Sequence, residues 1–198
     1  SWLVQISYFI ANFIITMAIA LIILAASLAY LGISGTFTLS IDDIFDTLRV
    51  LVLSVLSSTA CMAVVARFFR TESSYGGFGG MVSAVLGFFI GAYMPISIFP
   101  KPVQYIANLI PGSHSAALFR NSIMRGAYQE ILNQTPEMFA KEIASAYSMR
   151  LNMFGTEIPT YVMNIYLVAS IVLFIGLNIL LSKVNLEKRF PKKPLKIK

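Results

Sequence analysis

Few residues of this chain carry groups that could do acid–base, nucleophilic or metal chemistry, and they form no catalytic pattern. The 198 residues include one histidine, His114, and one cysteine, Cys61, which lie far apart in the sequence. Active sites and metal sites need several such groups brought together, so we predict no catalytic, cofactor-binding or metal site. We expect His114 to be structural or solvated, and Cys61 to be a small packing residue in an apolar helix.

A cluster of three acids is the other candidate for chemistry. Asp42, Asp43 and Asp46 lie within five residues and could suggest a cation site. Calcium loops need many oxygen ligands in a defined spacing, and this cluster lacks that pattern. Ser40 precedes the acids, and a serine followed by acids suits the positive end of a helix dipole. The cluster therefore predicts the start of a helix.

The glycine-rich run 76–80 could suggest a phosphate-binding loop. No GxxxxGK[ST] pattern occurs anywhere in the chain, and no lysine follows these glycines. We therefore expect a flexible start of the next helix and no nucleotide site in this chain.

The composition places the chain in a membrane. It is 57% hydrophobic and 12% charged, whereas soluble domains have about 25% charged residues. The net charge of +6 is concentrated in the C-terminal tail, so no nucleic-acid partner is predicted. A span needs about 20 apolar residues, and four such runs predict an all-α polytopic membrane protein with one domain over residues 1–198. The predicted spans are about 5–31, 48–69, 79–97 and 161–181.

Prolines break the sequence directly after the third predicted span. Pro95, Pro100, Pro102 and Pro111 follow in quick succession, yet the segment between them stays apolar. An apolar segment that is too short to span and is bounded by prolines predicts a re-entrant hairpin. Within the third span, Gly87 and Gly91 form a GxxxG motif, which predicts close helix packing.

Two further helices are predicted between the hairpin and the last span. Ser113 is a good N-cap for the first, and Gly126 stands where a C-terminal glycine belongs. The second follows Thr135-Pro136 and carries an apolar stripe of Phe139, Ile143 and Tyr147, so we expect an amphipathic helix lying over the membrane domain. The re-entrant and amphipathic region is predicted over 98–160.

The distribution of basic residues predicts the orientation. The tail 182–198 carries seven Lys or Arg, and the connection 32–47 carries none. The positive-inside rule places this tail in the cytoplasm, and four spans place the first residue there too. The region 98–160 is then external. The tail acts as a topology anchor or binds a protein or anionic lipid, and the residues do not decide between these roles.

The order of these parts resembles the second half of a type-2 ABC transporter permease, in the ABC exporter permease family. A spanning helix with Gly87, Gly91 and Pro95 is followed by Phe99-Pro100 and Pro102. A short apolar helix then ends at Pro111, and the next helix carries Arg120, Arg125 and Gly126. A final span and a basic end complete the pattern. The resemblance implies that the four spans are the third to sixth of six.

The resemblance also implies a function and partners. The chain would be a multi-pass permease of the cell membrane that exports a hydrophobic or amphipathic cargo such as a drug, lipid, peptide or glycan. It would pair with a second permease half, and a partner or fused nucleotide-binding domain would bind ATP and Mg and hydrolyse the ATP. Asn12 and Thr16, four residues apart in the first span, are the candidate cavity lining, although hydrogen bonding between helices is the commoner role of such a pair.

The external gate would be formed by the hairpin and its neighbours. The candidate gate residues are Gly87, Gly91, Pro95, Phe99, Pro100, Pro102 and Pro111, followed by Arg120, Arg125 and Gly126 in the next helix. The alternative is a secondary transporter or channel subunit that is not driven by ATP. Such proteins usually carry ionisable residues inside their spans, and the span centres here have none.

Overall fold

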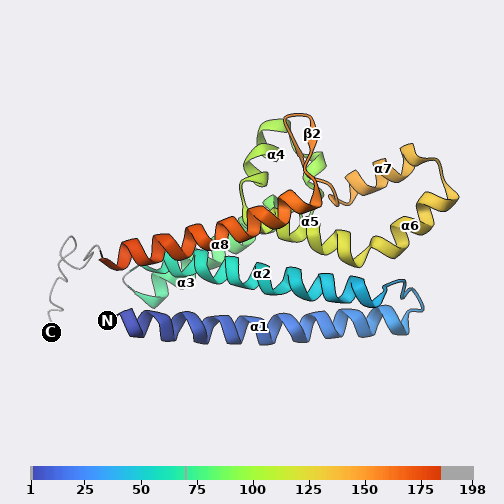
Figure 1. Ribbon diagram of the computed structural model, residues 1–198. Helices are drawn as coiled ribbons and strands as arrows, with labels where there is room; N and C mark the ends of the chain where they lie inside the picture. Colours follow the sequence, from blue (N-terminus) through green and yellow to red (C-terminus); the bar gives the residue numbers. More distant parts are fainter. Residues whose placement is uncertain (1, 70, 184–198) are drawn as a thin grey trace, which may run out of the picture.

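A computed structural model describes residues 2–69 and 71–183 of the chain. These residues form eight α-helices, one short 3-10 helix and one β-hairpin (Figure 1). In chain order the elements are α1 (Trp2–Ile33), α2 (Ile41–Ala66), α3 (Glu72–Phe89), η1 (Ile96–Ile98), α4 (Lys101–Asn108), α5 (Pro111–Ile123), α6 (Arg125–Gln134), α7 (Glu137–Ala146), β1 (Asn152–Met153), β2 (Thr156–Glu157) and α8 (Thr160–Lys183). The prediction of a helical membrane protein is confirmed. The β-hairpin formed by β1 and β2 was not predicted. Nearly all of the basic tail lies outside the described residues.

Three of the helices are long and apolar enough to cross a membrane. They are Gln5–Ile33, Ile41–Ala66 and Thr160–Ser182. These helices coincide with the predicted spans 5–31, 48–69 and 161–181, except that α2 begins several residues earlier than expected.

The early start of α2 is explained by its cap. The Ser40 hydroxyl accepts a hydrogen bond from the Asp43 backbone N–H at 3.2 Å, and the Asp43 carboxylate accepts one from the Ser40 N–H at 3.0 Å. This reciprocal pair is a capping box, which satisfies two N–H groups at the helix start. The prediction that the acidic cluster marks a helix start is confirmed.

The third predicted span differs from the structure in its boundaries. The helix α3 begins at Glu72 and ends at Phe89, so the predicted range 79–97 is not one continuous helix. Its 18 residues would extend about 27 Å, and its glycines and Glu72 lower its hydropathy. Among the described residues, α3 is not one of the three helices that are long and apolar enough to cross a membrane. A fourth membrane crossing therefore stays a prediction.

The positions of the chain ends support a return by this segment. In Figure 1 the start of α1 and the end of α8 lie at one end of the bundle, together with the connection between α2 and α3. The connection between α1 and α2 lies at the other end, near α6. An arrangement with both chain ends on one side needs an even number of crossings, so α3 and the residues after it carry the chain back.

The core of the molecule lies between α2, α5 and α8, each of which packs against the other two. Its fully buried side chains include Val50 from α2, Leu118 from α5 and Leu167 from α8. The Ser57 and Ser170 hydroxyls are 2.8 Å apart and hydrogen bond across the α2–α8 contact. The small side chains of Ser57 and Ala60 are buried on α2, which allows α8 to approach it closely.

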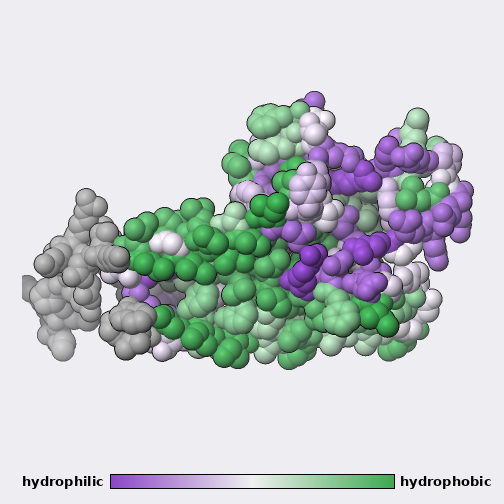
Figure 2. All heavy atoms as spheres, viewed as in Figure 1, coloured by the Kyte–Doolittle hydropathy of each residue, from purple (hydrophilic) through white to green (hydrophobic). Residues whose placement is uncertain are grey.

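The helix α1 is peripheral to this core. It packs against α2 through Leu24, which lies against Leu51 and Val55. At the end where the chain termini lie, the Arg67 guanidinium donates to the side-chain oxygens of Asn178 (3.1 Å) and Gln5 (2.7 Å), which connects α1, α2 and α8. Figure 2 shows hydrophobic residues along most of the bundle, and hydrophilic residues gathered over the part that includes α6 and α7.

Candidate functional site

The end of α3 is shaped by the two glycines of the predicted GxxxG motif. Gly91 has φ +76°, its N–H donates to the Phe88 carbonyl at 3.0 Å, and the Ala92 N–H donates to the Gly87 carbonyl at 2.9 Å. This pattern is a Schellman motif, which ends a helix with a left-handed residue. A Cβ on Gly87 would lie 2.2 Å from a ring carbon of Tyr93. The glycines therefore end α3 and allow the following loop to fold onto it, and a Cβ on Gly91 would also lie 3.5 Å from Nη1 of Arg120 on α5.

The predicted gate prolines each stand where a missing N–H costs nothing. Pro95 and Pro100 are the N-caps of η1 and α4, Pro102 lies in the first turn of α4, and Pro111 is the first residue of α5. The Phe99 carbonyl between them accepts a hydrogen bond from the Gln104 side chain at 2.7 Å. The predicted hairpin thus corresponds to the loop after α3, η1 and α4, and α5 is the helix that follows it. Its re-entrant and external placement stays a prediction.

Arg120 joins α5 to the end of α3. Its guanidinium donates to the Gly91 carbonyl, and the Ser113 hydroxyl donates to the Phe89 carbonyl at 3.3 Å. No carboxylate pairs with Arg120 within residues 2–69 and 71–183, and its Nη1 is buried without a partner there. The negative end of the α3 dipole is therefore the nearest compensation for this cation.

Ser113 does not cap a helix, contrary to the prediction. The helix α5 begins two residues earlier at Pro111, and Ser113 is fully buried with its hydroxyl donating to the Ala107 carbonyl at 2.6 Å. Proline at the first position of α5 already fixes the helical φ, so no side-chain cap is needed.

Arg125 belongs to a different network, at the start of α6. It forms ion pairs with Asp43 at 2.9 Å and with Asp46 at 2.8 Å, and Asp46 also pairs with Arg49 at 3.1 Å. The hydrogen bond that Arg125 donates to Asp46 raises the pKa of Arg125, burial opposes this shift, and the charges of the nearby aspartates add to it. The acidic cluster therefore caps α2 and binds Arg125.

Gly126 was predicted as a C-terminal glycine and this prediction is wrong. The helix α5 ends at Ile123, and α6 begins at Arg125, so Gly126 lies in the first turn of α6. A Cβ on Gly126 would lie 2.1 Å from the Thr38 carbonyl oxygen. The glycine is thus required by the close approach of the connection between α1 and α2.

His114 is buried between the hairpin and α8. It is 3% exposed, its Nε2–H donates to the Asn108 carbonyl at 2.7 Å, and its ring stacks on Tyr166 with centroids 4.2 Å apart. Burial lowers the pKa of His114, while the hydrogen bond to Asn108 opposes the shift. Its Nδ1 has no partner in the described part of the chain. The imidazole therefore packs between the Asn108 carbonyl and the Tyr166 ring.

Several polar side chains that hold η1 and α4 in place were not predicted from the sequence. Asn108 donates to the Asn152 carbonyl at 2.7 Å, the Tyr166 hydroxyl donates to the Leu109 carbonyl at 2.7 Å, and the Ser148 hydroxyl accepts from the Ile96 N–H at 2.8 Å. Asparagine and tyrosine inside an apolar stretch were the available signal, because buried polar groups need partners. Their partners are backbone groups, which leave no trace in the sequence.

The predicted amphipathic helix exists as α7, but its buried side differs from the prediction. Ala140 and Ala144 are buried, whereas Phe139 and Tyr147 are each 56% exposed. The small alanines allow α7 to approach its neighbours, so the larger residues of the predicted stripe face outward.

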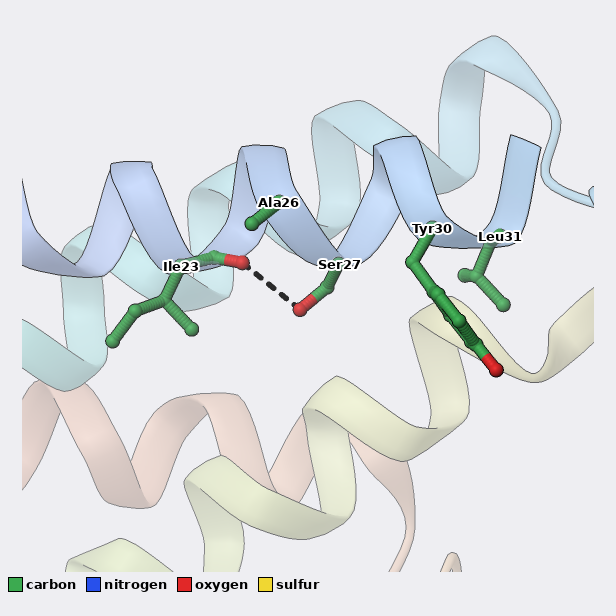
Figure 3. A pocket seen from close by; sticks show the side chains of 5 residues that line it. All are labelled: Ile23, Ala26, Ser27, Tyr30 and Leu31. Carbon is green, nitrogen blue, oxygen red and sulfur yellow. Dashed lines mark hydrogen bonds between the residues drawn. The ribbon is translucent and has the colours of Figure 1, made fainter. Parts of the chain in front are cut away.

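Asn12 and Thr16 lie on an exposed face of α1 and form no side-chain hydrogen bond within the described residues. This face continues along the helix, since Ile23, Ser27 and Tyr30 follow at spacings of seven, four and three residues. A groove of about 500 Å³ is lined there by Ile23, Ala26, Ser27, Tyr30 and Leu31, and Figure 3 shows the hydrogen bond from the Ser27 hydroxyl to the Ile23 carbonyl.

The face turned away from this groove has a different character. Ile14, Leu21 and Ile22 are exposed and apolar there. The helix α1 therefore has three faces: one against α2, one that is apolar, and one that carries Asn12, Thr16, Ser27 and Tyr30. The structure does not connect Asn12 or Thr16 to Arg120 or to the hairpin by hydrogen bonds among the described residues.

Comparison with known proteins gives one family match. A family model described as ABC-2 family transporter protein matches residues 3–183. No curated protein and no solved structure matches the chain. The match covers α1 to α8, so it includes both the hairpin and the polar face of α1.

Proposed function

Because the chain belongs to the ABC-2 family of transporter proteins, we propose that it is the permease of an ATP-driven exporter in the cell membrane. A partner subunit or fused domain would bind ATP and Mg and hydrolyse the ATP. A second permease half, identical or different, would complete the path. The cargo would be hydrophobic or amphipathic, such as a drug, lipid, peptide or glycan.

The polar face of α1 is the observation that carries this proposal. A carboxamide such as that of Asn12 is costly in the hydrocarbon core unless protein or water satisfies it. Asn12 is exposed and unpartnered within the described residues, and Ile14, Leu21 and Ile22 are exposed on the opposite face of the same helix. Water and cargo in a path between two permease halves would satisfy Asn12 and Thr16.

The absence of charge in the span centres supports an uncharged or amphipathic cargo. The described part of α1 holds no charged residue, and α2 holds none from Val50 to Ala66. Ionisable groups inside a membrane usually mark ion or proton pathways. A path lined by amide, hydroxyl and apolar groups suits a hydrophobic or amphipathic molecule better than an ion.

The link between α3 and α5 supports a role for the hairpin as the external gate. Arg120 and Ser113 hold the last carbonyls of α3, so a movement of α5 would carry the end of α3 with it. Gly91 has a left-handed backbone conformation, and the chain can bend at this residue between α3 and the segment that follows it. The orientation that places this gate outside follows from the positive-inside rule.

The test is purification of the whole protein in mild detergent, followed by an ATPase assay of whatever binds it. We expect an ATPase subunit or domain to accompany the chain, and amphipathic compounds to change its rate of hydrolysis. Purification without any nucleotide-binding partner would contradict the proposal. Flux that follows a proton gradient without ATP would then favour the secondary transporter or channel.

A further inference from the structure

The tip of the β1–β2 hairpin and the helix α4 share an exposed apolar surface. Phe154, at the tip, is 75% exposed, and its ring lies 4.8 Å from that of Tyr105 on α4. Ile106 and Leu109 at the end of α4 are also more than half exposed. We name these four residues the hairpin patch. None of these four residues is among the candidate gate residues, although α4 belongs to the proposed gate.

The backbone at Phe154 is unusual for so large a side chain. Phe154 has φ +51° and Gly155 has φ +83°, the arrangement of a type I′ turn. Asparagine and glycine are the ordinary residues of such turns, because a bulky side chain is strained at positive φ. The chain therefore keeps an aromatic ring at a strained and exposed turn, which favours a surrounding that removes the ring from water.

The position of the hairpin along α8 indicates which surrounding that is. β2 ends at Glu157, and the spanning helix α8 begins at Thr160. The β1–β2 hairpin therefore lies at the level where α8 enters the membrane. Tyr161, in the first turn of α8, is 67% exposed. The hydrogen bond from Tyr166 to the Leu109 carbonyl joins the patch to α8. The hairpin patch thus continues the exposed apolar surface of a membrane-spanning helix.

The two sides of the projecting part differ in polarity. In Figure 2 hydrophobic residues colour the side that carries α4, and hydrophilic residues colour the side toward α7. At the base of the hairpin Arg150 and Glu157 form an ion pair. Apolar and aromatic groups on one side, with charges beside them, match the graded polarity of a membrane interface, where tyrosine and other aromatic residues gather.

We propose that the hairpin patch is a membrane-interface anchor, with the rings of Phe154 and Tyr105 at the level of the lipid headgroups. The anchor gives the segment between α6 and α8 a lipid contact of its own and does not depend on ATP or on cargo. A second copy of the chain fits this surface less well, because stable protein interfaces bury about 20–30 residues on each side and the patch has four.

Tryptophan fluorescence in liposomes tests the proposal. The one tryptophan of the sequence, Trp2, is changed to phenylalanine, and Phe154→Trp or Tyr105→Trp is added to that background. Gln129→Trp on α6 is the matched control for water, and Val172→Trp on α8 is the control for the membrane interior. Each protein is titrated with acrylamide in the water, and is compared in lipids brominated near the glycerol or near the middle of the acyl chain.

We expect Phe154→Trp and Tyr105→Trp to lose most emission to lipid brominated near the glycerol. Val172→Trp should lose most to mid-chain bromine, and Gln129→Trp to acrylamide. Acrylamide quenching of both patch variants as strong as that of Gln129→Trp, with no effect of bromine, would place the patch in water and overturn the proposal. If neither quencher reached either patch variant, a protein surface would cover the patch, and the lipid anchor would be wrong.

Discussion

Two arginines five residues apart, Arg120 in the last turn of α5 and Arg125 at the start of α6, hold their charges in different ways. Arg120 is partly buried and donates to a backbone carbonyl at the end of α3, with no carboxylate partner among the described residues. Arg125 has a side chain that is 44% exposed and pairs with two aspartates. A helix end can hold a cation where carboxylates would be costly to bury, and carboxylates serve where water helps to solvate the group.

The two arginines also differ in what they connect. Arg120 joins α5 to the end of α3, the segment proposed to bend during transport. Arg125 and Gly126 join α6 to the start of α2 and to the connection before it. We call the Arg120 contact the joint, because it is a candidate for movement, and the contacts of Arg125 and Gly126 the frame. The following predictions test this difference, from the largest expected effect to the smallest.

Gly126→Ala should reduce stability more than any of the other variants, because it disturbs the contact between α6 and the connection before α2. The added Cβ would meet the Thr38 carbonyl oxygen at 2.1 Å, and overpacking against backbone cannot be relieved by a rotamer change. We expect the free energy of unfolding in mixed micelles to fall by about 3 kcal/mol. Gly80→Ala on α3 is the control, since a Cβ there meets nothing within 4 Å. Equal stability of the two variants would refute the close contact.

Arg120→Met should have the next largest effect. The Gly91 carbonyl would lose a charged donor at the end of α3, and we expect a loss of about 2 kcal/mol, since hydrogen bonds to charged groups have this magnitude. Because the contact is shielded from solvent, added salt should leave the difference unchanged. Arg49→Met, at a side chain that is 56% exposed, is the control and should cost much less. A loss that disappears in high salt would count against the buried contact.

Arg125→Met should cost about 1 kcal/mol, because its pairs with Asp43 and Asp46 are partly exposed. The same measurement repeated at high ionic strength should show a smaller difference, since salt screens exposed charges. This behaviour would be opposite to that of Arg120→Met. If salt did not change the loss of stability in Arg125→Met, the Arg125 contacts would not differ in this respect from the Arg120 contact, and the distinction between the joint and the frame would be lost.

The pH dependence should show the smallest effect. The ordinary pKa of histidine is 6.5, and burial lowers the pKa of His114 in the folded chain. Below pH 6.5 the unfolded chain binds a proton that the folded chain does not. Stability should therefore be full above that pH and fall as the pH decreases toward the folded pKa. His114→Gln should flatten this part of the profile, and an unchanged slope in that variant would assign the dependence to other groups.

The features that the sequence predicted correctly are those with local causes. Long uncharged runs predict α1 and α8, and Ser40 with Asp43 predicts the start of α2, because hydropathy and caps act within a few residues. The prolines also predict a break after the third predicted span, and Pro95 and Pro100 are the N-caps of η1 and α4.

The features that it missed depend on contacts between distant segments. The role of Gly126 is fixed by Thr38, which lies in the connection between α1 and α2. The position of Arg120 depends on the carbonyl of Gly91, and backbone partners carry no residue signature. For the same reason, the GxxxG spacing of Gly87 and Gly91 led to a prediction of close packing between helices. A glycine spacing does not reveal whether a second helix or the chain's own loop approaches it.

ATP-dependent uptake of an amphipathic compound into inside-out membrane vesicles is the most direct test of the exporter assignment. Uptake should require ATP, and Asn12→Leu should reduce it while Ile14→Leu, on the apolar face of α1, leaves it unchanged. Uptake that proceeds without ATP and follows a proton gradient would contradict the account.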